Sequence, residues 1–369
     1  MSLSFTPLFP GMLLDAASRY AQDHLLEVTG DPLRELGWTA TLVLEAFGGV
    51  GGSLADLASI VEGVASHGVH LPLVETCAVV PLLLQAAAPE TAQRWLEAVA
   101  EGSVQMAPLT ALSSSLEHTG VRARHLDIGY ELDGVVQGVD ASLPATHYLV
   151  PALIDDDVAL FLVDAERIGA PQATWRTMDG GRGADFRLAQ VSVPEGACIA
   201  RGAPARAALL AADDAALLLT ATDTVAALAA LIQQTILHLK ERKQFGVALS
   251  SFQVLRHRVA EMYVKYLGAK GLLLHCFEEQ QAGAPDLRRT LRLAKVSLAE
   301  SARWCAEAAI QMHGGMGMSE EVLATRLAQR LLAAEFHYGD RLEHAARLLA
   351  HDAAADRSQP PSILAGSAQ

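Results

Sequence analysis

Apolar residues recur with a helical period through most of the second half of the chain. One stripe steps by three or four positions from Val225 to Leu239, and a second does the same from Leu291 to Met312. Stripes of this kind bury against neighbouring helices. Residues 204–352 are therefore predicted to form a C-terminal four-helix-bundle domain.

The middle of the chain has a different pattern, made of short runs of apolar and β-branched residues. Three of these runs cover residues 146–150, 158–165 and 186–194, and each is bounded by clusters of Gly, Pro or Asp. Short runs between turn residues are typical of antiparallel strands. We therefore expect residues 106–203 to form a central antiparallel β-barrel-like domain.

Helical signals also fill the N-terminal part of the chain. Ser53 is placed to cap a helix, and Pro89 opens another helical stretch that ends at Gly102. Residues 1–105 are predicted to be an N-terminal helical domain, and the polar, Ala-rich residues 353–369 a flexible tail. Helices, then strands, then helices predict an α+β fold rather than a doubly wound nucleotide-binding fold.

The composition narrows the class of protein. Of the 369 residues, 51% are hydrophobic and 19% are charged, which excludes an intrinsically disordered chain. The formal net charge of −14 argues against nucleic acid and anionic membranes as partners. The most apolar region, residues 207–232, contains Asp213, Asp214 and Asp223. It is therefore not expected to span a membrane, which takes about 20 consecutive apolar residues.

The cellular compartment is predicted from the N-terminus and the cysteines. No basic segment precedes the short apolar stretch at the N-terminus, so a signal peptide is not expected. The chain has four scattered cysteines, which form no CxxC pair: Cys77, Cys198, Cys276 and Cys305. Reduced thiols are the ordinary state of such cysteines in the cytoplasm, so we expect a cytoplasmic protein.

Generic motifs assign no chemistry to the chain. Glycine-rich runs at 48–53, 180–183 and 314–317 all lack the ending of a phosphate-binding loop, and each by itself is interpreted as a turn. His67 and His70 lie three residues apart without Asp or Cys ligands beside them. No metal site is therefore predicted.

Two segments of the C-terminal half together resemble a known family. Residues 241–263 contain an RxxFG motif followed by FQ, and residues 308–321 contain QxHGGxG. The order and separation of these motifs resemble the acyl-CoA dehydrogenase family. The matching residues are Arg242, Phe245, Gly246, Phe252, Gln253, Gln311, His313, Gly314, Gly315 and Gly317. Weaker matches at 36–38 and 45–53 are similar to the family's N-terminal helical domain.

The resemblance implies a flavoenzyme that uses FAD to oxidise an acyl-CoA thioester to the trans-2-enoyl-CoA. In the family, a carboxylate removes the α-proton while hydride passes from the β-carbon to the flavin. The family passes its electrons to an acceptor resembling electron-transfer flavoprotein. The resemblance also implies a homo- or hetero-oligomer with another dehydrogenase-like chain, because the family's motifs reach the cofactor of a neighbouring subunit.

The family pattern also assigns cofactor-binding residues. Arg242 is implied to contact the FAD pyrophosphate across the subunit interface, with Phe245 and Gln253 flanking the cofactor. Gln311, Gly314 and Gly315 are implied to bring their backbone close to the FAD of a neighbour. Without the resemblance, Phe245 is interpreted as a core residue and Gly314–Gly315 as the end of a helix.

The catalytic base is left unassigned, because this chain departs from the family at both usual positions. In the sequence HYGD at 337–340, Tyr338 replaces the expected glutamate and Asp340 the threonine that faces FAD. The other usual position falls on Ala216. Asp213 and Asp223 lie nearby on the same predicted helix and remain alternatives, each of which can instead cap or solvate that helix.

The segments that resemble the lining of the flavin ring are also altered. The loop at 109–120 does not match the family's pattern, and in 132–141 Gly138 and Asp140 stand where tryptophan and threonine are expected. Members that act on steroid side chains include heteromers, which build one FAD site from two chains. We therefore expect a subunit of such a heteromer. The alternative is a non-catalytic subunit or an acyl-CoA-binding module.

Overall fold

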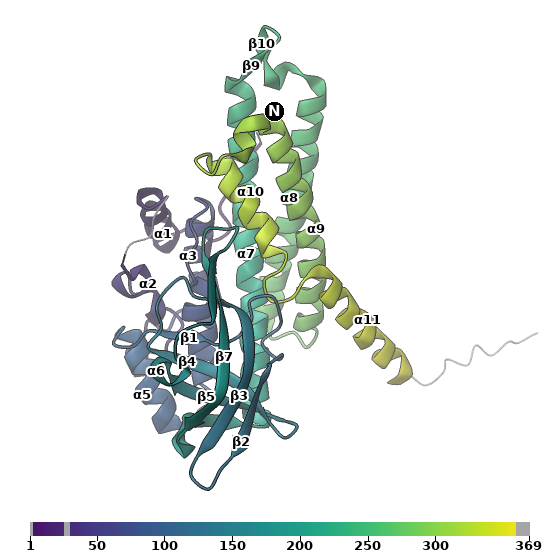
Figure 1. Ribbon diagram of the computed structural model, residues 1–369. Coiled ribbons are helices and arrows are strands. Elements are labelled where there is room, and N and C mark those ends of the chain that lie inside the picture. Colours follow the sequence, from purple (N-terminus) through teal and green to yellow (C-terminus); the bar gives the residue numbers. More distant parts are fainter. Residues whose placement is uncertain (1–2, 26–29, 359–369) are drawn as a thin grey trace, which may run out of the picture.

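The N-terminal part consists of short helices around a buried helix. The computed structural model describes residues 3–25 and 30–358 (Figure 1). The helices are α1 (Met12–Asp23), α2 (Pro32–Glu35), α3 (Leu54–Ala65), a π-helical turn (Glu75–Val79), α4 (Val80–Leu84) and α5 (Pro89–Ala100), with 3₁₀ turns at Trp38–Ala40 and Glu45–Phe47.

Local signals position α3 as the sequence predicted. The side chain of Ser53 accepts from the backbone N–H of Asp56, whose carboxylate accepts from the N–H of Ser53 in return. Gly63 lets α1 pack closely, because a Cβ at this position would lie 2.7 Å from the Cβ of Ala17. A methyl group there would force the two helices apart.

The central part is one open sheet. Its strands are β1 (Met106–Pro108), β2 (Val121–His125), β3 (Tyr130–Asp140), β4 (His147–Ile154), β5 (Asp157–Asp164), β6 (Ala173–Arg176), β7 (Arg182–Val193) and β8 (Cys198–Arg201), with α6 (Ala165–Ile168) after β5. The order is β6-β7-β3-β2-β4-β5-β8, and β1 pairs with β4. Most pairs are antiparallel, but β1–β4 and β2–β4 are parallel.

The sheet does not close into the barrel-like form that the short strands predicted. β2 and β4 meet through a single residue pair, Arg122 and Leu153, while β6 and β8 lie at opposite edges. This weak link divides the sheet into one part with β6, β7, β3 and β2 and another with β4, β5 and β8. The two parts bury a shared core, in which the rings of Tyr130 and Phe161 lie 5.2 Å apart. Packing of one part on the other buries the apolar faces without closure.

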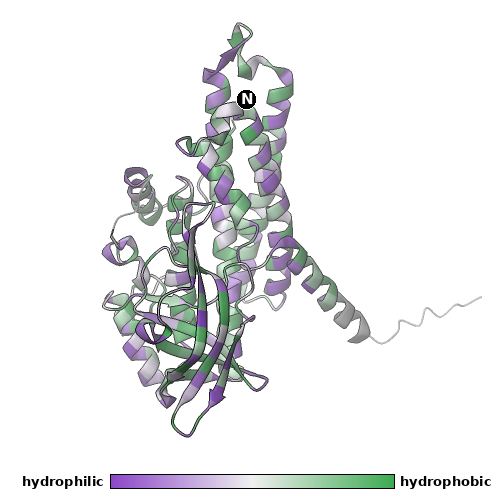
Figure 2. Cartoon of the chain, in the orientation of Figure 1, coloured by the Kyte–Doolittle hydropathy of each residue, from purple (hydrophilic) through white to green (hydrophobic). Residues whose placement is uncertain are grey.

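The C-terminal part is a helical bundle, as predicted. It contains α7 (Ala203–Glu241), α8 (Gln253–Ala282), α9 (Leu287–His313), a 3₁₀ turn (Gly314–Met318), α10 (Leu323–Ala334) and α11 (Arg341–Ser358). A small hairpin of β9 (Lys243–Gln244) and β10 (Val247–Ala248) joins α7 to α8. Along these helices hydrophobic and polar positions alternate (Figure 2).

Two features of the bundle bear on the sequence predictions. Helix α7 is long and apolar enough to cross a membrane, but 89% of its most apolar window is buried inside the fold. It is therefore the central helix of the bundle, and α8, α9 and α10 pack against it. Helix α11 points away from the body (Figure 1) and continues to Ser358, past the boundary at 353 that the composition predicted for a tail. Residues 359–369 lie outside the described residues.

Candidate functional site

The two motifs of the C-terminal half meet at one end of the bundle. We call this end the bundle tip, defined by residues 238–253 and 311–318. The ring of His238, in the last turn of α7, stacks on the ring of His313 at the end of α9, with centroids 4.4 Å apart and planes at 23°. This contact places the RxxFG hairpin beside the QxHGGxG turn, although the sequence separates them by two helices.

The side chains at the bundle tip face outward. Phe245 is 90% exposed and adopts a left-handed backbone with φ of 53°, so it is not the core residue that its apolar character alone indicated. Arg242, Gln253 and Gln311 are exposed as well. Among the described residues, none forms an ion pair with the Arg242 guanidinium.

The glycines of the QxHGGxG turn differ in their surroundings. Gly314 ends α9, and its N–H donates to the carbonyls of Gln311 and Ile310, as expected of a helix terminus. At both Gly314 and Gly315 an added Cβ would meet no atom within 4 Å. Gly317 instead packs internally, where a Cβ would lie 2.7 Å from the carbonyl oxygen of Ile310. The first two glycines thus leave open space in front of an exposed backbone.

A second polar region lies where the three parts of the chain meet. The resemblance places a flavin ring between the end of β3, at 138–140, and the turn at 337–340. In this structure that place holds a set of buried and half-buried polar side chains, which we call the polar cluster. Its members are His70, Glu75, Asp140, Asp179, Asp223, Arg330 and Tyr338.

His70 is held between two carboxylates of the sheet. Its Nε2 lies 2.9 Å from Asp140 Oδ2 and its Nδ1 lies 3.1 Å from Asp179 Oδ2. Burial by itself lowers the pKa of His70, but the carboxylates of Asp179 and Asp140 raise it well above its usual range. Burial opposes the charge of Asp179 too, yet His70 holds the pKa of that carboxyl far below its usual value. The group is therefore an imidazolium between two carboxylates at neutral pH.

Tyr338 stands at the position of the family's glutamate and bonds to a carboxylate from the N-terminal helices. Its hydroxyl donates to Glu75 Oε1 at 2.5 Å. Burial, together with the nearby charge of Asp140, raises the pKa of Glu75 to about 7. The backbone N–H of Tyr338 donates to Leu112, and its carbonyl accepts from His344 Nε2 at 2.9 Å. A left-handed φ of 57° makes this tyrosine a strained position.

The two alternative base candidates on α7 both have structural partners. Arg330 donates from Nε to Asp223 Oδ1 at 2.7 Å, and its NH1 donates to the carbonyl of Val69 at 2.9 Å. Asp213 accepts from the backbone N–H of Leu116 at 2.9 Å, and burial raises the pKa of its carboxyl. Neither carboxylate extends into an open substrate cleft.

Lys295 stabilises the turn that carries Tyr338. Its Nζ donates to the carbonyls of Ala334 at 2.6 Å and His337 at 2.7 Å. Burial lowers the pKa of this lysine to about 7, against the opposing charges of Glu335 and Asp340. A buried lysine thus binds the backbone carbonyls at the end of α10.

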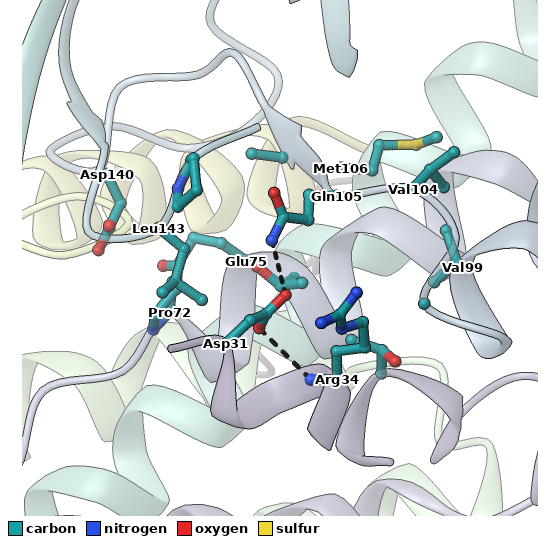
Figure 3. Close-up of a pocket in the computed structure, with 15 residues that line it drawn as sticks. Asp31, Arg34, Pro72, Glu75, Val99, Val104, Gln105, Met106, Asp140 and Leu143 are labelled. Atoms are coloured by element: carbon teal, nitrogen blue, oxygen red, sulfur yellow. Dashed lines mark hydrogen bonds between the residues drawn. The ribbon is translucent and has the colours of Figure 1, made fainter. Parts of the chain in front are cut away.

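Little space is left within the polar cluster. Its cavity has a volume of about 40 Å³, enough for a few waters at roughly 10–15 Å³ of such volume each. Glu75 and Asp140 also line a neighbouring cavity of about 30 Å³, where Asp31 accepts from Gln105 Nε2 at 2.8 Å (Figure 3). Sites for drug-sized ligands typically have a volume of ~300 Å³ or more. The polar cluster therefore leaves no room for a flavin ring among its side chains, and the open groove of about 870 Å³ lies on the outer side of His70.

Most of the polar cluster was missed by reasoning from the sequence. His70 was considered only as a metal ligand, and in the described part of the chain no group of His, Cys, Asp or Glu is arranged to hold a metal. Asp179 and Arg330 carry no local signal, because their partners come from distant segments. The replacements at Tyr338 and Asp140 were visible in the sequence, and both residues belong to the polar cluster.

Comparison with known proteins agrees with these motifs. Family models described as the acyl-CoA dehydrogenase N-terminal and C-terminal domains match residues 12–103 and 216–341. The acyl-CoA dehydrogenase IpdE2 of Mycobacterium tuberculosis is 29% identical over 78% of this chain and 74% of its own length. FadE28 of the same organism, also an acyl-CoA dehydrogenase, is 30% identical over 76% of this chain and 80% of FadE28.

Solved structures share the fold of this chain. The crystal structure of the ChsE4–ChsE5 complex from Mycobacterium tuberculosis superposes with a TM-score of 0.80 at 19% identity, covering 96% of this chain and 100% of that chain. The sequence relatives match 76–78% of this chain, and the fold matches 96% of it. The chain belongs to the acyl-CoA dehydrogenase family, whose members are FAD flavoproteins that oxidise acyl-CoA thioesters.

Proposed function

We propose that this chain is one subunit of a heteromeric acyl-CoA dehydrogenase, and that its bundle tip binds the FAD held by a different dehydrogenase-like chain. The observation that carries the proposal is a contrast within one molecule. The motif residues that reach a neighbour's cofactor are exposed together, whereas the place of the chain's own flavin ring is filled by the polar cluster.

The bundle tip has the chemistry that a dinucleotide requires. Arg242 presents an exposed guanidinium that suits the oxygens of a pyrophosphate. Phe245 and Gln253 offer an apolar face and an amide beside it, and the backbone at Gly314 and Gly315 is open to close approach. FAD, when bound, supplies the hydride acceptor for oxidation of the acyl group. In this arrangement the partner chain holds the flavin ring and supplies the catalytic base.

Several further features fit the proposal. The ChsE4–ChsE5 complex, which shares this fold, is an assembly of two different chains. An acyl-CoA thioester is the substrate, and an electron carrier resembling electron-transfer flavoprotein is the acceptor. Cys77, Cys276 and Cys305 are free and buried, as expected in the cytoplasm, where we place the protein.

One observation favours a second candidate function. With Tyr338 in place of the glutamate and a cavity of about 40 Å³, this chain resembles a subunit that has kept the fold and lost the chemistry. Such a subunit would bind acyl-CoA or a partner without contacting FAD. The two candidates differ in what Arg242 does.

Co-expression with a neighbouring dehydrogenase-like gene tests the proposal. We expect the flavin-to-protein ratio, read from visible absorbance, to rise well above that of this chain alone. In the assembled complex, Arg242→Ala should abolish flavin retention and turnover. Arg206→Ala is the matched control, because Arg206 is exposed in the first turn of α7, whereas Arg242 directly follows the other end of that helix. Equal flavin content in the two variants would favour the non-catalytic subunit.

A further inference from the structure

Residues 69–75, which lead from α3 into the π-helical turn, contact both other parts of the chain. The imidazole of His70 reaches Asp140 and Asp179 of the sheet. The carbonyl of Val69 accepts from Arg330 of α10, and the carboxylate of Glu75 accepts from Tyr338. One short segment therefore joins the N-terminal helices to the sheet and to the bundle through buried polar contacts.

The charges in this cluster are paired rather than exposed. The side chains of His70, Asp140 and Asp179 are 11%, 4% and 3% exposed. Arg330 pairs with Asp223 and is itself buried. A buried ion pair tolerates loss of one partner poorly, because the remaining charge stays desolvated and uncompensated. The pairs of His70 join the N-terminal helices to the sheet, whereas Arg330 and Asp223 both belong to the bundle, and Arg330 reaches the N-terminal part through the carbonyl of Val69.

The backbone around His70 is shaped to enclose its ring. Asp179 and Gly181 lie on the turn between β6 and β7, and a Cβ at Gly181 would lie 2.5 Å from His70 Nε2. On the outer side, His70 also lines an open groove of about 870 Å³, while on the inner side it lines the small cavity of the cluster. Its ring therefore forms the wall between the groove and the interior.

We propose that the polar cluster replaces the flavin ring as the connection between the three parts of this chain. The inference rests on the proposed function, in which FAD is held by the partner. His70 fills the place of the ring, and Asp140 and Asp179 would put two carboxylates against any flavin that entered. The chain consequently fills the place of the ring with its own side chains and needs no cofactor of its own to hold its parts together.

The first test is a titration of the purified, unpartnered chain with FAD. We expect about 100 µM FAD to raise the melting temperature by less than ~1 °C, since a ligand stabilises only the state that binds it. A clear rise, with flavin absorbance co-eluting at one per chain, would overturn the proposal. This measurement uses the unmodified chain, so it remains informative if a variant fails to fold.

The second test removes the centre of the cluster. His70→Gln leaves Asp140 and Asp179 without their cation, and we expect the melting temperature to fall by about 8 °C. The matched control is His125→Gln, since His125 pairs with Glu195 at 3.2 Å but both side chains are more than half exposed, at 59% and 64%. We expect a change of less than ~1 °C there. An equal fall in melting temperature for the two variants would contradict the proposal that the polar cluster holds the parts of the chain together.

A milder variant, Asp179→Asn, keeps the shape of the turn and tests the same pairing. It should lower the melting temperature by an intermediate amount, and its effect should shrink when His70 is already Gln. Full additivity of the two substitutions would contradict a coupled cluster. The heteromer proposal has a separate test: it would be contradicted if co-expression with a partner chain left the flavin content unchanged.

Discussion

Tyr338 and Glu75, which are 263 positions apart in the sequence, share a 2.5 Å hydrogen bond at the position that the resemblance assigns to the family's catalytic glutamate. A carboxylate is thus present near the usual position, but it comes from the N-terminal helices and is covered by a tyrosine hydroxyl. Tyr338 is buried and Glu75 is half-buried, and the two cavities beside Glu75 have volumes of only about 30 and 40 Å³. This pair therefore joins two parts of the chain.

Glu75→Gln tests the charge state of this pair. Burial raises the pKa of Glu75 to about 7, so the folded chain favours the protonated carboxyl. Its contribution to stability is complete below the pKa of the unfolded chain, near 4, and is lost as the pH rises through 7. The amide should therefore raise the melting temperature at pH 8, by about 3 °C, and have little effect at pH 5. Thermal melts of both proteins at these pH values check this. A stabilisation that is the same at both pH values would contradict the assignment.

Tyr338→Glu restores the family residue and should not restore chemistry. The new carboxylate would lie beside Glu75 in a buried site, where like charges and desolvation both oppose ionisation. We expect a loss of about 3 kcal/mol in the free energy of unfolding at pH 8 and no dehydrogenase activity of the isolated chain. Tyr338→Gln is the uncharged control and should lose less. Turnover by the glutamate variant alone would contradict the proposal that this chain's own flavin site is filled.

Gly315→Ala separates stability from cofactor contact at the bundle tip. The added methyl group meets no atom of this chain within 4 Å, and Gly315 has no left-handed backbone to strain. The isolated chain should therefore change its unfolding free energy by less than ~0.5 kcal/mol. In the assembled complex the methyl group would intrude on the partner's FAD, so flavin should dissociate faster during gel filtration. Unchanged flavin retention would place the cofactor elsewhere.

Lys295→Met tests the support of the turn at 337–340. The variant loses both bonds from Nζ, to the carbonyls of Ala334 and His337, and should cost about 2–3 kcal/mol in unfolding free energy. Burial lowers the pKa of Lys295 to about 7, so above pH 7 the unfolded chain binds more protons at this lysine than the folded chain does. The free energy of unfolding that Lys295 contributes therefore increases as the pH rises from 7. The difference between wild type and variant should be larger at pH 9 than at pH 6. Denaturant unfolding at the two pH values measures it.

Local patterns in the sequence were sufficient for much of the fold. The cap at Ser53, the apolar stripes of α7 and α9, and the motif residues from Arg242 to Gly315 depend on neighbours within a few positions. Such interactions are encoded in spacing and residue type, which is why the helix–sheet–helix order and the family were predicted without coordinates. The departures at Gly138, Asp140 and Tyr338 could also be identified in this way.

Only the tertiary structure decided how the altered positions are used. Whether a sheet closes depends on whether its two edge strands pair, and here the edge strands β6 and β8 do not pair, which no local pattern indicates. The polar cluster likewise joins His70, Asp140 and Arg330 from three separate parts of the chain. The stability of a buried charge depends on which partner lies beside it in space, and that is settled only when the distant segments pack together.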